Sequence, residues 1–425
     1  MRLLVICINY APEIISTGVY TTGLAEWMAD KGVETDVVTA RPYYPAWRVF
    51  EGWRRSAWIN RISENGVRIT HCPIYVPSNP TGLKRILHYV TFALSAFPVV
   101  LWKSLCRRPD VVVLVAPSMI AAPVAAVGAR LARGASWLHI QDYEVEAAFA
   151  TGLLKEDTLA GKLAKRFEAW VLNRFDKVSS ISAPMLNKLR EKKVREERIY
   201  ELRNWANLNK VSPMPEGSSP LKQDLGIETK YVALYSGNLA NKQGLEILPE
   251  MARHLSHRDD LTIAVCGDGP MRKVLEEMSK DAPAIRFFPL QPLEKLSELL
   301  GMADVHLLPQ IAGAADLVLP SKLTNMLASG RPVVATTPVR SALGDEVDGV
   351  GRITPPGDAA EMAQALDQLL NSPEERRELG EKARQRALER WDMDSILDRT
   401  KTEFMRLSGK TADAAHTLES AKDIR

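Results

Sequence analysis

Cysteine is scarce in this sequence, with four residues in a chain of 425. The four stand far apart and lack the paired spacing of a metal site. We therefore expect reduced core residues of a cytosolic protein. The cysteines are Cys7, Cys72, Cys106 and Cys266.

The N-terminal MRLLVICINYAP has too little apolar sequence for a signal peptide. It carries one arginine and a continuous run of only six apolar residues, 3–8, and we expect a first buried strand there instead. No full G-x-G-x-x-G follows this strand, and the sequence has no Tyr-x-x-x-Lys pair. These absences argue against a dinucleotide-dependent enzyme such as an epimerase.

What the sequence does have is an ordinary soluble composition, 46% apolar and 25% charged, over a length typical of two or three domains. Its charge is uneven. Residues 1–205 contain 28 Lys and Arg against 19 Asp and Glu, whereas the remainder contains 27 against 33. A basic front half suggests an anionic partner: nucleic acid, a phosphate-bearing substrate or anionic lipid.

Short β-branched runs alternate with helical segments, and this rhythm occurs twice along the chain. The expected strands are 3–9, 35–40, 110–116, 136–142 and 177–182, then 231–237, 261–267, 285–290, 304–309 and 331–337. The expected N-terminal helices include 20–31, 117–133 and 159–174. The rhythm predicts an α/β protein with two doubly wound parallel-sheet, Rossmann-like domains facing a central cleft.

Composition also predicts the domain boundaries. A segment rich in Pro, Ser and Gly follows the first series of strands and has no periodicity, which is typical of a linker. We expect an N-terminal domain over 1–206, a linker over 207–228, a C-terminal domain over 229–388, a helix over 389–408 that crosses back to the N-terminal domain, and a loose tail over 409–425.

Several expected strands end in glycine-containing turns before a helix. Such turns let the backbone approach a ligand closely and aim N–H groups at phosphate. A lone Gly-x-Gly is more often only a turn, but several such loops at one edge of a sheet predict a shared anion site. The residues are Gly18 in the first domain and Gly237, Lys242, Gly244, Gly267 and Gly269 in the second.

The segment LVLPSKLTNMLASGRPVVATT adds a cation to these loops. Ser321 is a helix N-cap candidate, Gly330 and Pro332 end the helix, and the helix is expected over 322–329. Lys322 lies in the first turn, where the helix dipole favours acidic residues. We interpret it as part of an anion site, with an ordinary solvent-facing lysine as the alternative.

The motifs YSGNLANKQGLEIL, VCGDGP, MADVHLLPQ and PSKLTNMLASGRPVVAT together resemble the C-terminal domain of the retaining glycosyltransferases of family 4, which have the GT-B fold. The opening YAPEIISTGVYTTGLAEWMADKGVETDVVTA is similar to theirs, so that the resemblance covers roughly residues 1–408. Within the family, the chain most resembles the bacterial exopolysaccharide branch, including colanic acid biosynthesis glycosyltransferases.

This resemblance implies sugar transfer from a nucleotide-sugar to an acceptor hydroxyl with retention of configuration. The family carries two glutamates where this sequence has Leu317, beside Asp316, and Asn325. Its usual Arg and Lys fall near Asn238 and Gln243. The implied donor-binding residues are Gly18, Gly237, Asn238, Gln243, Gly267, Gly269, Leu290, Ser321 and Asn325, with Lys242 and Lys322 stabilising the leaving diphosphate.

No metal or other cofactor is expected if lysines and backbone N–H groups supply the positive field. The acidic DMD at 392–394 is a possible metal motif, but we interpret it as the first turn of the last helix. Asp142 ends an expected strand and is the candidate that orients or deprotonates the acceptor; Glu144 is its substitute, and a turn-capping role is the alternative. We expect His139 to be a core histidine.

The one longer apolar stretch, residues 82–108, has about 17 apolar-dominated residues between clusters of cations, marginal for a span of about 20. It fits a helix lying in the membrane interface or lining an acceptor groove, or an ordinary helix packed on the sheet. The candidate membrane or acceptor cations are Lys84, Arg85, Arg107 and Arg108, and Lys103 also flanks the stretch.

We therefore expect an enzyme on the inner face of the plasma membrane. Its partners would be a nucleotide-sugar, favoured as a GDP-sugar such as GDP-fucose over a UDP-sugar, a polyprenyl-diphosphate-linked saccharide, and the anionic membrane surface, but not nucleic acid. Two alternatives stay open: transfer to a soluble acceptor, and a catalytically impaired scaffold that only binds sugar nucleotide.

Overall fold

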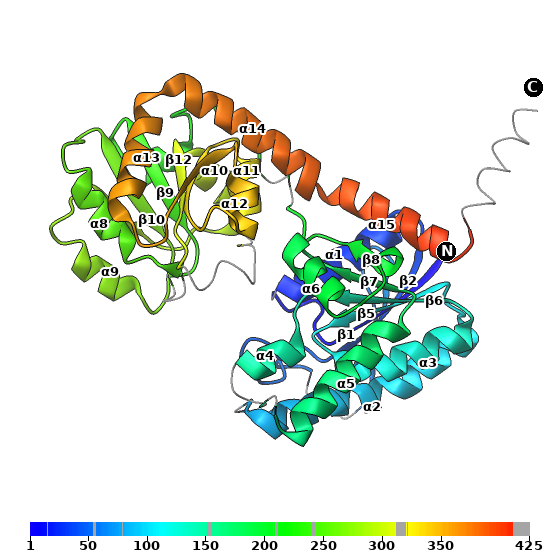
Figure 1. The fold of residues 1–425 in the computed structure, drawn as a ribbon. Helices are drawn as coiled ribbons and strands as arrows, with labels where there is room; N and C mark the ends of the chain where they lie inside the picture. Colours follow the sequence, from blue (N-terminus) through cyan, green and yellow to red (C-terminus); the bar gives the residue numbers. More distant parts are fainter. Residues whose placement is uncertain are drawn as a thin grey trace, which may run out of the picture. The chain divides into compact units, whose positions relative to one another are not determined.

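The computed structural model describes residues 1–14, 16–53, 57–78, 80–150, 155, 157–206, 208, 211–239, 243–311, 320 and 322–410. The chain divides into two compact units, each with an α/β fold (Figure 1). Unit 1 contains Met1–Asn204 and the C-terminal part of the chain from Leu397, and unit 2 contains Trp205–Ile396.

Unit 1 is built on an eight-stranded sheet with the order β3-β4-β2-β1-β5-β6-β7-β8. All neighbouring strands pair in parallel except β3, which is antiparallel to β4. Central strands such as β5 are buried along their whole length, which explains their continuous β-branched sequence. The strands are β1 Arg2–Cys7, β2 Glu34–Ala40, β3 Ile59–Ile62, β4 Arg68–Cys72, β5 Val111–Ala116, β6 Ala135–Ile140, β7 Lys177–Ser180 and β8 Ile199–Glu201.

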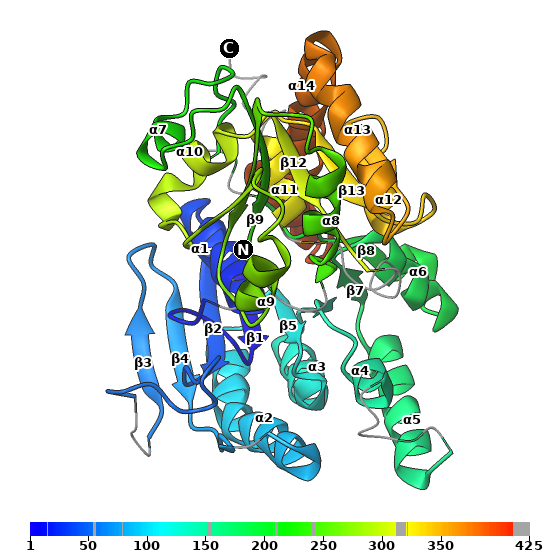
Figure 2. The same ribbon diagram turned by 90° about the vertical axis from the view of Figure 1, so that its left-hand side faces the viewer.

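Helices cover both faces of this sheet. Figure 2 shows α2, α3 and α5 along one face, where they share a core with α6. The last helix, α15, returns to the other face, where the Phe404 ring lies 4.8 Å from the Trp137 ring. The helices are α1 Ser16–Asp30, α2 Gly82–Cys106, α3 Ala122–Ala132, α4 Glu144–Ala150, α5 Leu159–Arg174, α6 Ala183–Glu191 and α15 Met393–Leu407, with 3-10 turns η1 Met119–Ala121 and η2 Glu196–Arg198.

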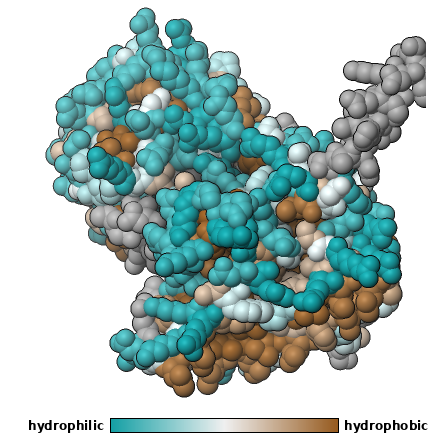
Figure 3. Space-filling model, turned by 45° about the vertical axis from the view of Figure 1, so that its right-hand side comes forward, coloured by the Kyte–Doolittle hydropathy of each residue, from teal (hydrophilic) through white to brown (hydrophobic). Residues whose placement is uncertain are grey.

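Helix α2 contains the long apolar stretch. It packs on the sheet through one face, which includes Phe92, Ala96 and Val100, and exposes apolar residues on the other. Among the described residues it is the one helix long and apolar enough to cross a membrane, and 33% of its most apolar window is buried. Figure 3 shows apolar side chains gathered along this side of unit 1. The exposed apolar residues of α2 are Leu83, Ile86, Leu87, Leu94, Phe97, Trp102 and Leu105.

One expectation about this region is wrong, and one cation that flanks the apolar stretch is buried. Lys103 lies inside unit 1 and forms an ion pair with Asp36 of β2. Cys106 is exposed at the end of α2 and is not a core residue. In both cases the helical period, which sequence composition does not display directly, decides which side faces the sheet.

Unit 2 has a fully parallel six-stranded sheet with the order β11-β10-β9-β12-β13-β14. Its two faces are covered by separate apolar cores. The strands are β9 Tyr231–Ser236, β10 Leu261–Cys266, β11 Ile285–Phe288, β12 Val305–Leu308, β13 Val333–Thr336 and β14 Gly351–Thr354. The helices are α7 Pro220–Asp224, α8 Ile247–His254, α9 Arg272–Met278, α10 Leu296–Gly301, α11 Lys322–Ala328, α12 Ala342–Val347, α13 Ala359–Asn371 and α14 Pro373–Trp391, with the 3-10 turn η4 Leu293–Lys295.

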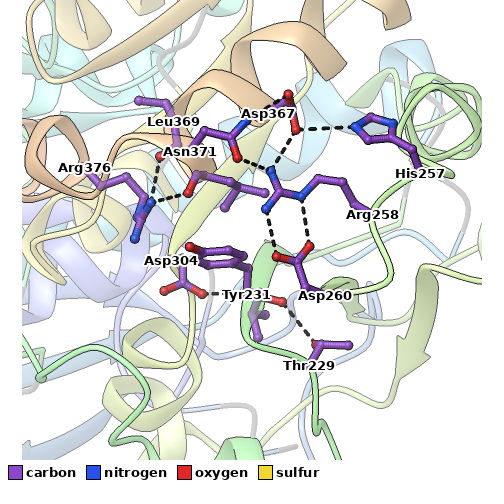
Figure 4. A network of polar contacts seen from close by, with 12 residues as sticks. Thr229, Tyr231, His257, Arg258, Asp260, Asp304, Asp367, Leu369, Asn371 and Arg376 are labelled. Atoms are coloured by element: carbon purple, nitrogen blue, oxygen red, sulfur yellow. Dashed lines mark hydrogen bonds and ion pairs between the residues drawn. The ribbon is translucent and has the colours of Figure 1, made fainter.

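A polar network fastens the amino-terminal edge of this sheet (Figure 4). The guanidinium groups of Arg258 and Arg376 lie 5.3 and 5.1 Å from the Tyr231 ring centroid. Arg258 pairs with both Asp260 and Asp367 at 2.9 and 2.8 Å. Arg376 donates to the carbonyls of the last turn of α13. The network therefore ties helices to the edge opposite the strand ends where ligands of such sheets bind.

Candidate active site

The glycine loops at the carboxyl ends of β9 and β10 pack backbone against backbone. A methyl group added at Gly267 would lie 1.9 Å from the carbonyl oxygen of Gly237, and one at Gly269 would lie 2.5 Å from that of Leu239. The Leu239 N–H donates to the Asp268 carbonyl at 2.9 Å. These positions therefore require glycine, and the predicted convergence of Gly237, Gly267 and Gly269 is observed.

Lys322 reaches into this group of loops from α11. Its ammonium donates to the Tyr235 hydroxyl at 2.9 Å and to Gln243 Oε1 at 3.0 Å. A Cβ at Gly237 would lie 3.8 Å from the same nitrogen. Burial lowers the pKa of Lys322 from 10.5 to about 7. The interpretation as a solvent-facing lysine is thus wrong: the cation is half-buried and held toward the glycine loops.

Three further residues, which sequence reasoning missed, shape this edge. The Tyr235 hydroxyl donates to the Asn238 carbonyl at 2.8 Å, so one phenol fixes both the loop and the lysine. The Gln310 N–H donates to Thr336 Oγ1 at 2.9 Å and links the ends of β12 and β13. Tyr235 directly precedes the glycine turn, so the local sequence could have indicated its role. The contact between Gln310 and Thr336 joins segments far apart in sequence and could not be predicted locally.

Arg272 is a second cation beside the same loops. Its guanidinium donates to the Gly267 and Phe288 carbonyls at 2.8 and 3.1 Å and pairs with Glu276 at 2.9 Å. Two of its nitrogens, Nε and Nη1, are therefore engaged with the protein. Arg272 supports the shape of the loops after β10 and β11, whereas the ammonium of Lys322 is directed toward Gly237.

The other predicted donor-binding residues lie in several parts of the chain. Asn325 lies half-buried one turn along α11 from Lys322, and Leu290 is exposed after β11. Gly18 belongs to unit 1 and lies inside the first turn of α1, not ahead of the helix as expected. Lys242 and Ser321, like Asp316 and Leu317, lie outside the described residues.

Unit 1 gathers acidic side chains after β6. The Glu144 carboxylate accepts a hydrogen bond from the Met119 N–H at 2.7 Å. Burial raises the pKa of Glu144 to about 7, and the negative charge of Asp142 adds to the increase. Burial also raises the pKa of Asp142, although its side chain is exposed. Glu144 is thus tied to the loop after β5, which leaves Asp142 as the carboxylate directed outward.

Arg85, at the start of α2, belongs to this acidic group. It is exposed, its guanidinium lies 6.0 Å from the Trp47 ring centroid, and its charge lowers the pKa of both Asp142 and Glu144. Of the four predicted membrane or acceptor cations, Arg85 alone lowers the pKa of the candidate acceptor residues Asp142 and Glu144. Lys84 and Arg108 are exposed and Arg107 is half-buried.

Aromatic rings surround the start of α2. His88 is buried and shares a 2.6 Å hydrogen bond with the Tyr75 carbonyl. Its ring lies 4.6, 5.3 and 5.5 Å from those of Tyr43, Trp47 and Tyr89. Burial lowers the pKa of His88, so the ring is neutral at physiological pH. The cluster forms an aromatic wall beside Arg85.

Glu13 joins the loop after β1 to the loop after β2. Its Oε1 accepts the N–H groups of Tyr43 and Tyr44 at 2.6 and 2.8 Å, and its Oε2 accepts from Asn9 at 2.8 Å. Burial raises the pKa of Glu13, and these donors oppose the increase. Sequence reasoning missed this contact, because its partners stand about 30 residues away.

His139 and Asp392 were not expected to act in catalysis, and each makes a structural contact. His139 is buried and lies 2.9 Å from Ser179 Oγ, and burial lowers its pKa to about 3, as expected of a core histidine. The Asp392 carboxylate accepts the Ser395 N–H at 2.8 Å and caps α15, as the interpretation of DMD predicts. Within the described part of the chain, no group of three or more His, Cys, Asp or Glu residues could hold a metal ion.

Comparison with known proteins agrees with this geometry. The family description Glycosyl transferase 4-like domain matches residues 17–205, and Glycosyl transferases group 1 matches residues 219–386. WcaI of Escherichia coli strain K12, named for colanic acid biosynthesis, is 38% identical over 384 residues, which cover 88% of this chain and 93% of WcaI. The chain belongs to family 4 of the glycosyltransferases.

A more distant relative is also named as a glycosyltransferase, and solved structures show the fold. WbjE of Pseudomonas aeruginosa, named as a glycosyltransferase, is 26% identical over 56% of this chain and 61% of its own length. Anabaena HepE, solved with UDP, has a TM-score of 0.68 at 16% identity, over 96% of this chain and all of HepE. The lipopolysaccharide glycosyltransferase WaaG has a TM-score of 0.61 at 16% identity over 96% of this chain and 100% of that one. This family 4 chain therefore has the GT-B fold.

Proposed function

We propose that this glycosyltransferase transfers a sugar from a nucleotide-sugar to a lipid-linked saccharide in exopolysaccharide assembly of the colanic acid type. The proposal of a nucleotide-sugar donor rests on the position of Lys322, whose ammonium is held by Tyr235 and Gln243 against the glycine loops. The 38% identity to WcaI supports the pathway. HepE complexes with UDP and UDP-glucose support a nucleotide-sugar donor.

On the donor side, unit 2 binds the diphosphate through Lys322 and the close-packed loops of Gly237, Gly267 and Gly269. A diphosphate beside Lys322 favours the charged ammonium, so donor binding raises the pKa of this lysine and takes up a proton at alkaline pH. The ammonium then stabilises the charge that grows on the leaving group, and no metal is needed for that step. Transfer proceeds with retention of configuration.

On the acceptor side, Asp142 orients the acceptor hydroxyl or takes its proton, Glu144 fixes the loop beneath it, and Arg85 binds a phosphate of the acceptor. The outward apolar side of α2, with Lys84, Arg107 and Arg108 near its ends, lies against the anionic inner face of the plasma membrane. The donor is a GDP-sugar, of which GDP-fucose is the first to test, with UDP-sugars as the second class.

The decisive experiment is a panel of GDP-sugars and UDP-sugars incubated with a polyprenyl-diphosphate-linked saccharide. We expect one donor to be consumed in an acceptor-dependent way, with the anomeric configuration of the product, read by NMR, matching that of the donor. Full activity should survive EDTA; loss that manganese restores would contradict the metal-independent mechanism. An inverted product would contradict retention.

A catalytically impaired scaffold is the second candidate, favoured by one observation. α11 carries Asn325 where the family has a glutamate, and an amide cannot supply its charge. A scaffold would bind nucleoside diphosphate through Lys322 without consuming donor, either on the lipid-linked acceptor or on water. Slow donor hydrolysis that depends on Lys322 would exclude it.

A further inference from the structure

An apolar groove of about 350 Å³ lies between α2 and α3 of unit 1. Every lining residue is uncharged and apolar. Part of the lining is open to solvent: Leu94 is 69% exposed, Val127 44% and Phe97 43%. A volume of this size is at the lower end of small-molecule sites, and its lining favours a hydrocarbon.

One end of the groove lies at the acidic site. Both helices follow a strand and lead to the next parallel strand, so both begin at the carboxyl edge of the sheet. Val90, in the lining, directly follows Tyr89 of the aromatic wall. Ile120, on the opposite wall, directly follows Met119, whose N–H donates to Glu144. The groove therefore begins one residue from Tyr89 and one residue from Met119, on the same edge of the sheet as Asp142.

The other end is closed by direct contact between the two helices. A Cβ at Gly128 of α3 would lie 2.7 Å from Val100 Cγ1 and 3.0 Å from Ser104 Oγ of α2. Both helices thus touch immediately beyond the lining, which ends at Phe97 on α2 and at Val127 on α3. A hydrocarbon chain that enters at the acidic site can therefore fill only a limited length of groove.

Two charged residues of α2 lie at the end of the helix nearest the acidic site, and the apolar groove follows them. Lys84 and Arg85 stand at its start, and no charged residue occurs between Arg85 and Lys103. From the edge of the sheet outward, the surface is therefore acidic at Asp142, cationic at Arg85 and then apolar. A lipid-linked saccharide has the matching sequence of parts, namely sugar hydroxyls, a diphosphate and a hydrocarbon chain.

We propose that the α2–α3 groove binds the first part of the hydrocarbon chain of the acceptor lipid, with the diphosphate at Arg85 and the saccharide at Asp142. This inference rests on the proposed function, because it assigns a part of the proposed acceptor to a surface. Each methylene that leaves water strengthens binding about fourfold, so the groove selects lipid-linked over free saccharide.

The test uses soluble acceptors that carry one saccharide diphosphate on alkyl chains of increasing length, each below its micelle concentration, with the full-length protein. We expect KM to fall about fourfold per added methylene until the groove is filled and then to level off. Because the chain binds equally in ground and transition states, kcat should change little. Equal KM for all chain lengths, with transfer intact, would overturn the groove and leave the proposed function standing.

Two substitutions on α2 provide a matched pair. Leu94→Glu places a carboxylate in the groove, whereas Leu105→Glu makes the same change outside it; the two leucines are 69% and 52% exposed, so both variants should fold. We expect the ratio of KM between short-chain and long-chain acceptors to collapse toward one in Leu94→Glu and to persist in Leu105→Glu. An equal collapse in both would indicate a general apolar surface and overturn the groove. No transfer to any acceptor would remove the proposed function and this inference with it.

Discussion

Among single residues, Lys322 gives the most direct test of the proposed donor site. Replacing it by Ala or Gln removes a charge-assisted contact to the diphosphate, and we expect nucleoside diphosphate affinity and transfer rate each to fall at least tenfold. Isothermal titration and initial rates measure the two effects. Lys280→Ala is the control, because this lysine is exposed and pairs only with Glu277 among the ion pairs of the described residues. Unchanged affinity in both Lys322 variants would refute the assignment.

The depressed pKa of Lys322 gives a second test. With a pKa of about 7 in the free protein, the side chain is charged below pH 7 and increasingly neutral above it. Affinity for nucleoside diphosphate should therefore decline from pH 7 to pH 8.5, with proton uptake visible as a buffer-dependent binding enthalpy. Lys322→Arg stays charged throughout and should lose this decline, while Lys322→Gln reports the titration of the ligand itself. An equal decline in all three proteins would contradict the shifted pKa.

Variants of Asp142 and Glu144 test the proposed roles of these residues as acceptor base and loop support. Asp142→Asn keeps size and loses the proton acceptor, so we expect kcat to fall about 10² or more with nucleoside diphosphate binding unchanged. Glu144→Gln retains an oxygen that can accept the Met119 N–H, and its kcat should fall much less. For wild type, the rate should also fall as pH decreases through the raised pKa of Asp142. A larger loss of kcat in Glu144→Gln than in Asp142→Asn would indicate that Glu144 is the acceptor base and Asp142 the support.

At the scale of elements, α2 is the helix to test on membranes. The protein should bind liposomes that contain phosphatidylglycerol at low salt and leave them at high salt, because each nearby cation contributes about 1 kcal/mol that salt screens. Neutralising Lys84, Arg85, Arg107 and Arg108 together should abolish binding in a flotation assay. Resistance to both salt and carbonate would show that α2 spans the bilayer. Absence of binding in every condition would favour a soluble acceptor.

Elements with a strong period were predictable, and those defined by distant partners were not. All ten expected strands occur, with ends shifted by up to two residues, and α5 begins and ends at the expected residues 159 and 174. The strands missed were β3, β4, β8 and β14, which are short and stand toward the sheet edges. β3, β8 and β14 are mostly exposed or half-buried, so their sequences carry a weaker apolar pattern, whereas β4 is buried but contains the polar residues Thr70 and His71.

The same rule applies to the site. Glycine turns at strand ends are local patterns, and the loops of Gly237, Gly267 and Gly269 meet as predicted. The orientation of Lys322 toward Tyr235 depends on residues 87 positions apart, and the burial of Lys103 depends on a partner 67 positions away. Neither is contained in the local sequence. Local sequence thus predicted that the glycine loops meet, while tertiary contacts determine which side chains lie beside them.

At the scale of the whole molecule, the C-terminal helix is the segment whose loss should affect one unit selectively. Unit 2 ends at Ile396, and the rest of α15 belongs to unit 1. There the Phe404 ring contacts that of Trp137, and Glu403 pairs with Lys177 at 2.7 Å. Removing this part of α15 exposes the apolar face of the sheet around Trp137, a loss of several kcal/mol by the cost of truncating a buried aromatic.

We therefore expect deletion of residues 397–425 to lower the unfolding temperature of unit 1 by more than 10 °C, while nucleoside diphosphate binding by unit 2 persists. Hydrogen exchange resolved by peptide distinguishes the units, since protection should fall in β6 and β7 and remain in β9 and β10. Deletion of 411–425 alone is the control, because it keeps all of the described α15 contacts. Phe404→Ala should reproduce part of the loss without shortening the chain. Unchanged protection in β6 and β7 after the longer deletion would show that unit 1 folds without its returning helix, and α15 would then be an accessory to the fold and not one of its supports.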